Sequence, residues 1–163
     1  MRRTLLALVL AAVALAVFWP ATANDFVNFD DDRYITENPL VQRGLDATSL
    51  RWAWTTGHMA NWHPLTWMSH MLDAQLFGAD PAGHHATSVV LHAIDTALIF
   101  VLLDVMTGAP WRSALVAALF ALHPTHVESV AWASERKDVL STCLWLLTTL
   151  AYVAWSRRPT RGR

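Results

Sequence analysis

The stretch ATSVVLHAIDTALIFVLLDVM, residues 86–106, decides the fold class of this chain. A helix rises about 1.5 Å per residue, so this run is long enough to cross the ~30 Å hydrocarbon layer of a bilayer. Similar apolar runs lie near the two ends of the sequence, TLLALVLAAVALAVFW at 4–19 and VLSTCLWLLTTLAYVAW at 139–155. The sequence therefore predicts an all-α membrane protein.

Composition supports the same class. Of 163 residues, 54% are hydrophobic and only 15% are charged, unlike an ordinary soluble domain. Tryptophans gather at membrane–water interfaces, and Trp19, Trp111 and Trp155 each lie at an end of an apolar run. A net charge of −1 argues against a nucleic-acid partner, and the single cysteine, Cys143, excludes an intramolecular disulfide.

A shorter apolar run, WRSALVAALFAL at 111–122, ends just before Pro124, which disfavours a helical conformation at His123. We interpret it as a further crossing. The predicted organisation is then four transmembrane helices, a large first outer loop, a smaller second outer loop and a basic tail. In chain order these are helix 1–20, loop 21–85, helix 86–106, helix 111–123, loop 124–138, helix 139–156 and tail 157–163.

The distribution of arginines predicts the orientation of these helices. Arg2, Arg3, Arg112 and the tail SRRPTRGR flank alternate ends of the four crossings. Basic residues favour the cytoplasmic side, so we expect both termini to be cytoplasmic, in a multi-pass protein of the bacterial inner membrane.

The N-terminus is also compatible with a cleaved signal peptide. Two arginines, an apolar core and the small residues Ala21–Ala23 fit such a peptide as well as they fit a membrane anchor. Periodicity and length leave both alternatives open.

The first outer loop contains NWHPLTWMSHMLDAQLFG, residues 61–78. Pro64 suits the first turn of a helix, and Leu65, Met68, Leu72 and Leu76 recur at helical spacing. The pattern predicts an amphipathic helix in the plane of the membrane interface. The alternative is that its apolar face packs against the protein's own crossing helices.

Two ionisable residues lie three positions apart inside the crossing at 86–106, namely His92 and Asp95. Such groups usually face the interior of a bundle or a wet cavity. They could line the path of a small metal or proton transporter, or His92 could simply hydrogen-bond a neighbouring helix.

The second outer loop reads HPTHVESVAWASERKD, residues 123–138. His123, His126 and Glu128 offer nitrogen and oxygen ligands for a divalent metal. His126 and Glu128, however, lie only two positions apart and would face different sides of a helix. Arg136 and Lys137 lie on the predicted outer side, where a cation can pair with a lipid-linked phosphate or belong to a solvated helix end.

These two loops carry a family resemblance. NWHPLTWMSHMLDAQLFGADPAGHHATSVVLHAIDTALIFVLL resembles the transmembrane and tetratricopeptide-repeat O-mannosyltransferases, with their R/H-P-L-T, G-x-x-P-x-G-x-H and L-L-H-A elements in order. LFALHPTHVESVAWASERKDVLS resembles the same family's L-F-x-x-H-P-x-H-x-E-x-V and R-x-D-x-L elements. The resemblance extends over residues 1 to about 155, and it favours an uncleaved first helix.

The resemblance implies a partial type-C glycosyltransferase fold, whose enzymes move a sugar from a polyprenyl-phosphate carrier to an acceptor protein on the outer face. Mannose and Ser/Thr hydroxyls are the family's implication for donor sugar and acceptor. Related transferases begin their first outer loop with D-D/E-x-x-Y/F, which FDDDRY matches with Asp30, Asp31 and Tyr34 and with Asp32 as a spacer.

We therefore expect Asp30 and Asp31 to be catalytic, and Arg136, His92, His126 and Tyr34 to bind substrate. A positioned carboxylate can accept the proton of an attacking hydroxyl, and a cation stabilises the departing phosphate. Without the resemblance, the three aspartates would indicate a solvated acidic loop or a calcium site rather than a catalytic motif.

Members of the family have more crossings, followed by tetratricopeptide repeats, so we expect this chain to be an N-terminal part that is inactive by itself. A non-catalytic membrane scaffold and a small transporter remain the alternative functions.

Overall fold

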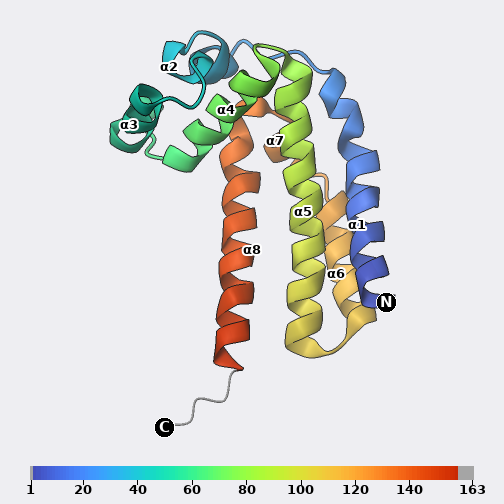
Figure 1. Cartoon of the computed structure of the whole chain (residues 1–163). Helices are drawn as coiled ribbons and strands as arrows, with labels where there is room; N and C mark the ends of the chain where they lie inside the picture. The colour runs from blue at the N-terminus through green and yellow to red at the C-terminus, as the bar shows by residue number, and fades with distance from the viewer. Residues whose placement is uncertain (1, 158–163) are drawn as a thin grey trace, which may run out of the picture.

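The computed structural model describes residues 2–157, so most of the predicted basic tail lies outside the described residues. Long helices form an upright bundle, and short helices cover one end of it (Figure 1). The bundle consists of α1 (Arg2–Phe18), α5 (Pro81–Thr107), α6 (Pro110–Leu122) and α8 (Arg136–Ser156). The covering elements are α2 (Pro39–Gln42), α3 (Ala47–Thr55) and α4 (Pro64–Phe77), with the short turns η1 (Trp19–Ala23), η2 (Asp32–Thr36) and η3 (His58–Ala60). The turn α7 (His126–Ala131) and the short η4 (Ala133–Glu135) lead from α6 into α8.

Three helical segments are long and apolar enough to cross a membrane: Arg2–Ala23, Pro81–Thr107 and Ala133–Ser156. The fourth predicted crossing, 111–123, is α6. At about 1.5 Å per residue its 13 residues extend about 20 Å, short of the ~30 Å hydrocarbon layer. Helix α6 nevertheless packs along α5 and α1 as part of the bundle.

The structure moves two predicted boundaries. Helix α5 begins at Pro81, not at residue 86, because the Asp80 carboxylate accepts a hydrogen bond from the Ala82 amide and Pro81 occupies the first helical position. Helix α8 begins at Arg136, not at residue 139. The start of α1 and the end of α8 lie at the same end of the bundle, opposite α2, α3 and α4 (Figure 1).

The covering elements have their own apolar core. Trp67 and Met71 of α4 are fully buried, and they pack with Tyr34, Ile35, Val41 and Ala53 from the elements before α4. The leucines of the predicted apolar stripe point the other way, since Leu65, Leu72 and Leu76 are 43%, 44% and 63% exposed. Leu65 nevertheless shares a groove with Leu140 and Leu144 of α8, so the interfacial helix and its packing against the crossing helices both stay predictions.

The buried side of α4 carries polar as well as apolar side chains. His70 and Asp73 are buried against the start of α5 and α8, while the leucines remain accessible. A lipid-facing helix shows this arrangement, because apolar side chains lose nothing by contacting lipid and polar groups must find partners inside the protein.

The contact between α4 and α5 predicts that Gly83→Ala destabilises the protein. A Cβ atom at Gly83 would lie 2.3 Å from Cγ and 2.6 Å from Cβ of Phe77, and the latter atom is fixed by the α4 backbone. We expect a loss of about 1–3 kcal/mol in the free energy of unfolding, measured by denaturation in detergent micelles. Gly57→Ala is the matched control, because nothing lies within 4 Å of its added Cβ. Equal stability of the two variants would contradict this packing.

Candidate functional site

The start of α8 is a place where the covering elements meet the bundle. Ser134, Arg136, Lys137 and Asp138 follow one another closely in the sequence, and each contacts a different part of the protein. The predicted acidic motif, the polar face of α4 and two cavities all meet this short segment.

Asp31 is fully buried and tied to this segment. Its Oδ1 accepts hydrogen bonds from the Ser134 amide at 2.9 Å and from the Ser134 hydroxyl, across 103 positions of sequence. Its Oδ2 accepts a hydrogen bond from the Val27 amide at 2.9 Å. Asp30 is partly exposed, and its carboxylate makes no hydrogen bond to the residues that the structure describes. The two predicted catalytic carboxylates therefore occupy different environments.

Arg136, the predicted phosphate ligand, lies inside the protein with no exposed surface. Its guanidinium pairs with Asp73 of α4 and also donates to the Ser69 and Ser88 hydroxyls and to the His84 carbonyl. Four donor contacts occupy nearly the whole planar fork of an arginine.

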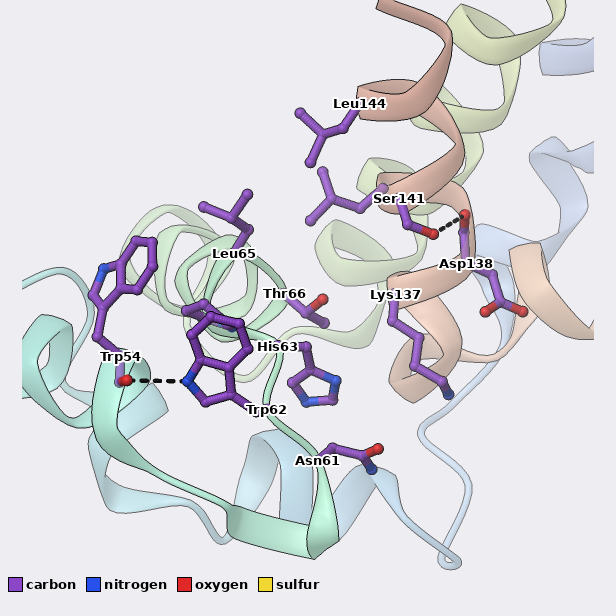
Figure 2. A pocket seen from close by; sticks show the side chains of 12 residues that line it. Trp54, Asn61, Trp62, His63, Leu65, Thr66, Lys137, Asp138, Ser141 and Leu144 are labelled. Atoms are coloured by element: carbon purple, nitrogen blue, oxygen red, sulfur yellow. Dashed lines mark hydrogen bonds between the residues drawn. The ribbon is translucent and has the colours of Figure 1, made fainter. Parts of the chain in front are cut away.

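The neighbouring Lys137 faces a groove between α4 and α8 with a volume of about 560 Å³ (Figure 2). Leu65, Leu140 and Leu144 line the groove together with Trp54 and Trp62, whose indole donates to the Trp54 carbonyl at 3.0 Å. Asn61, His63, Lys137 and Asp138 supply its polar part. Figure 2 shows His63 and Lys137 on the same side of this groove, with Asn61 beside them.

Burial and a nearby charge set the protonation state of His63 in this groove. Burial, followed by the charge of Lys137, lowers the pKa of His63, so its imidazole is neutral near pH 7. The Lys137 ammonium contacts the Glu135 carboxylate at 2.5 Å, and its side chain is 35% exposed. A partly solvated ammonium beside a neutral imidazole can receive an anion.

Tyr34 links the acidic motif to the groove. It is buried, and its hydroxyl accepts a hydrogen bond from the Asn61 amide at 2.9 Å. Burial is the main reason that its pKa is raised; the Asn61 hydrogen bond and Lys137 oppose that shift, while Asp30 and Glu135 add to it. Tyr34 therefore lies within electrostatic reach of both Asp30 and Lys137.

His92 and His126 line a second, more polar cavity of about 250 Å³, with Asp95 and Asp138. Their ring centroids are 5.5 Å apart, and His92 Nε2 lies 3.1 Å from the Ala121 carbonyl oxygen. The structure thus gives His92 the helix-to-helix hydrogen bond that the sequence left as an alternative. Asp138 and Ser141 line both cavities, so the two adjoin across α8.

The predicted metal residues lie at the end of α6 and in α7, and His126 is the one that lines the second cavity. His123 and Glu128 are exposed, and the ring centroids of His123 and His126 are 6.2 Å apart. Within residues 2–157, the trio of histidine and carboxylate groups whose ligand atoms lie within 4.8 Å of one another is His70, Asp73 and His84.

Sequence reasoning missed Ser134 and Asp73, and it did not assign His63 or Asn61 to a site. One available signal was the position of His70 and Asp73 off the apolar stripe of α4, since polar residues of a helix predicted to face lipid are expected to point into the protein. No comparable signal marks Ser134, because its partner Asp31 is remote in sequence.

Known proteins similar to this chain are protein O-mannosyl-transferases of animals. TMTC1 of Mus musculus is 35% identical over 159 residues, which cover 90% of this chain and 16% of that protein. Tmtc1 of Drosophila melanogaster is 34% identical over 151 residues, covering 87% of this chain and 17% of its own length. TMTC2 of Homo sapiens is 30% identical over 162 residues, which cover 95% of this chain and 19% of that protein.

The chain thus spans less than a fifth of the length of each of these three proteins. No family model and no solved structure matches it. From the identities over about nine-tenths of its length, the chain belongs to the transmembrane and tetratricopeptide-repeat O-mannosyltransferase family that its motifs indicated.

Proposed function

We propose that this chain is the N-terminal part of an integral-membrane protein O-mannosyltransferase. In this proposal the whole protein takes mannose from a polyprenyl-phosphate carrier and attaches it to Ser or Thr hydroxyls on the outer face of a bacterial inner membrane. Both termini of the chain are then cytoplasmic. The relatives supply the transferase class through their names; the carrier and the orientation are parts of the proposal.

The groove between α4 and α8 is the observation that carries the proposal. A polyprenyl phosphate has an apolar tail and one anionic head, and the groove combines a leucine and tryptophan wall with the ammonium of Lys137. Leu65 of α4 lines the groove and is partly exposed, so in this proposal the tail remains in lipid while the phosphate reaches Lys137. Arg136 does not face the groove; its buried ion pair with Asp73 holds α8 against α4, the two helices that form the groove.

In this proposal Asp30 and Asp31 have different roles. Asp30 is partly exposed and can accept the proton of the acceptor hydroxyl as that oxygen attacks the anomeric carbon of the sugar. Asp31 holds the acidic motif against Ser134 and so fixes the place of Asp30. Lys137 stabilises the negative charge that develops on the phosphate as the glycosidic bond breaks.

A proton or metal transporter is the second candidate, and one observation favours it. The cavity lined by His92, Asp95 and His126 contains a buried carboxylate inside a predicted crossing, where ionisable groups usually serve transport or catalysis. Asp95→Asn should abolish transport under this hypothesis and leave mannosyl transfer intact under the first.

Asp30→Asn should abolish most mannosyl transfer. Loss of a positioned general base lowers rates about 10²–10⁴-fold, and the amide cannot accept the hydroxyl proton. The measurement uses the longer protein that contains this chain, reconstituted in nanodiscs with polyprenyl-phosphate mannose and an acceptor protein. Asp32→Asn is the matched control, since Asp32 accepts a hydrogen bond from the adjacent Arg33 amide and has no assigned role. Full activity of Asp30→Asn would refute the proposed base.

Lys137→Gln should raise KM for the lipid-linked donor and also lower kcat, because the ammonium contacts the phosphate in both the ground state and the transition state. Lys137→Arg keeps the charge and should retain most activity. Unchanged kinetics in Lys137→Gln would exclude this lysine as the phosphate ligand.

Lys137→Gln should also raise the pKa of His63 by removing a nearby positive charge. The protonated imidazole is then less disfavoured, so its titration midpoint moves to higher pH but remains below the usual histidine range because burial persists. NMR titration of histidine-labelled protein measures this shift, and Lys137→Arg should leave the midpoint low. A midpoint that does not move would contradict the geometry of the groove.

A further inference from the structure

A group of buried imidazoles lies beside the Arg136–Asp73 pair, where α4 meets the first turns of α5. His70 and Asp73 are three positions apart on α4 and share one of its faces, and His84 comes from α5. All three side chains are buried, and their ligand atoms lie within 4.8 Å of one another.

Hydrogen bonding fixes the orientation of His84. Its Nε2 lies 3.1 Å from the Gly78 carbonyl oxygen, which can only accept, so Nε2 carries the proton. In the neutral ring Nδ1 then holds a lone pair, and it faces the Asp73 carboxylate at 3.7 Å. Two electron-rich atoms at this separation, inside the protein, favour a cation between them.

His70 offers a second nitrogen ligand. Both of its ring nitrogens are buried without a hydrogen-bond partner among the described residues. Its ring stacks on that of His84 with centroids 6.0 Å apart.

We propose that His70, Asp73 and His84 bind a zinc ion that joins α4 to α5. Two imidazoles and one carboxylate suit Zn²⁺, whose ligands lie about 2.0–2.2 Å from the metal and about 3.3 Å from one another in a tetrahedron. The 3.7 Å between His84 Nδ1 and Asp73 Oδ2 is close to that spacing. This proposal does not depend on the mannosyl-transfer reaction.

Thr87 and the Gly78 carbonyl hold two of the proposed ligands in place by hydrogen bonds. The Thr87 hydroxyl donates to Asp73 Oδ1 at 2.9 Å, and the Gly78 carbonyl orients His84. Metal-ligating carboxylates and histidines are usually held in this way by second partners.

Arg136 sets a limit on the affinity of this site. Its guanidinium pairs with the same Asp73 oxygen that faces His84, so zinc and arginine share one carboxylate. The positive charge of Arg136 disfavours a second cation nearby. Arg136→Gln should therefore bind zinc more tightly than the unmodified chain.

The test measures zinc directly and needs no activity assay. The purified chain in detergent is stripped with a chelator, dialysed against Zn²⁺ and analysed by mass spectrometry for metal content, with Co²⁺ absorption as a second readout. We expect about one zinc per chain. Thr87→Val should weaken binding about 10–100-fold through the lost second partner, and His70→Gln should abolish it.

His70→Cys keeps a zinc ligand and should retain binding, with a new thiolate-to-Co²⁺ charge-transfer band that a purely structural role of His70 would not produce. His123→Gln is the matched control and should bind zinc like the unmodified chain. The proposal is overturned if the unmodified chain takes up no zinc, if folded His70→Gln binds it equally well, or if His123→Gln is the variant that loses it.

Discussion

The buried ion pair between Arg136 and Asp73 is the interaction on which the packing of α4 against the bundle depends. It joins the first residue of α8 to the polar face of α4, and the same guanidinium reaches Ser88 and the His84 carbonyl of α5. A buried guanidinium is tolerated only where its charge is paired and its donors are satisfied. The pair therefore fixes three helices at one point.

That point also determines what the groove presents. Because Arg136 is turned inward, the next two residues, Lys137 and Asp138, face the groove at the level of the covering helices. Ser134, two positions earlier, holds Asp31 and with it the acidic motif. Five consecutive residues, 134–138, thus set the relative positions of the proposed base and the proposed phosphate ligand.

Local patterns in the sequence were sufficient to locate the elements. Apolar runs predicted α1, α5, α6 and α8, and proline with helical spacing predicted α4, because both signals depend on neighbours within a few positions. The faces of these helices were harder to predict. Which side of α4 is buried depends on whether its surroundings are lipid or protein, and the choice of Asp73 as the partner of Arg136 depends on contacts 63 positions apart.

Arg136 illustrates what sequence alone leaves undecided at this site. Its charge made it the expected phosphate ligand, but sequence alone could not decide whether Arg136 or Lys137 faces the groove. Adjacent positions on a helix point about 100° apart, so one of two neighbouring cations can enter the protein while the other faces out. The inward residue then needs a carboxylate, and Asp73 supplies it. The outward residue, Lys137, pairs with Glu135 and remains partly solvated, and there we propose that it meets the anionic donor.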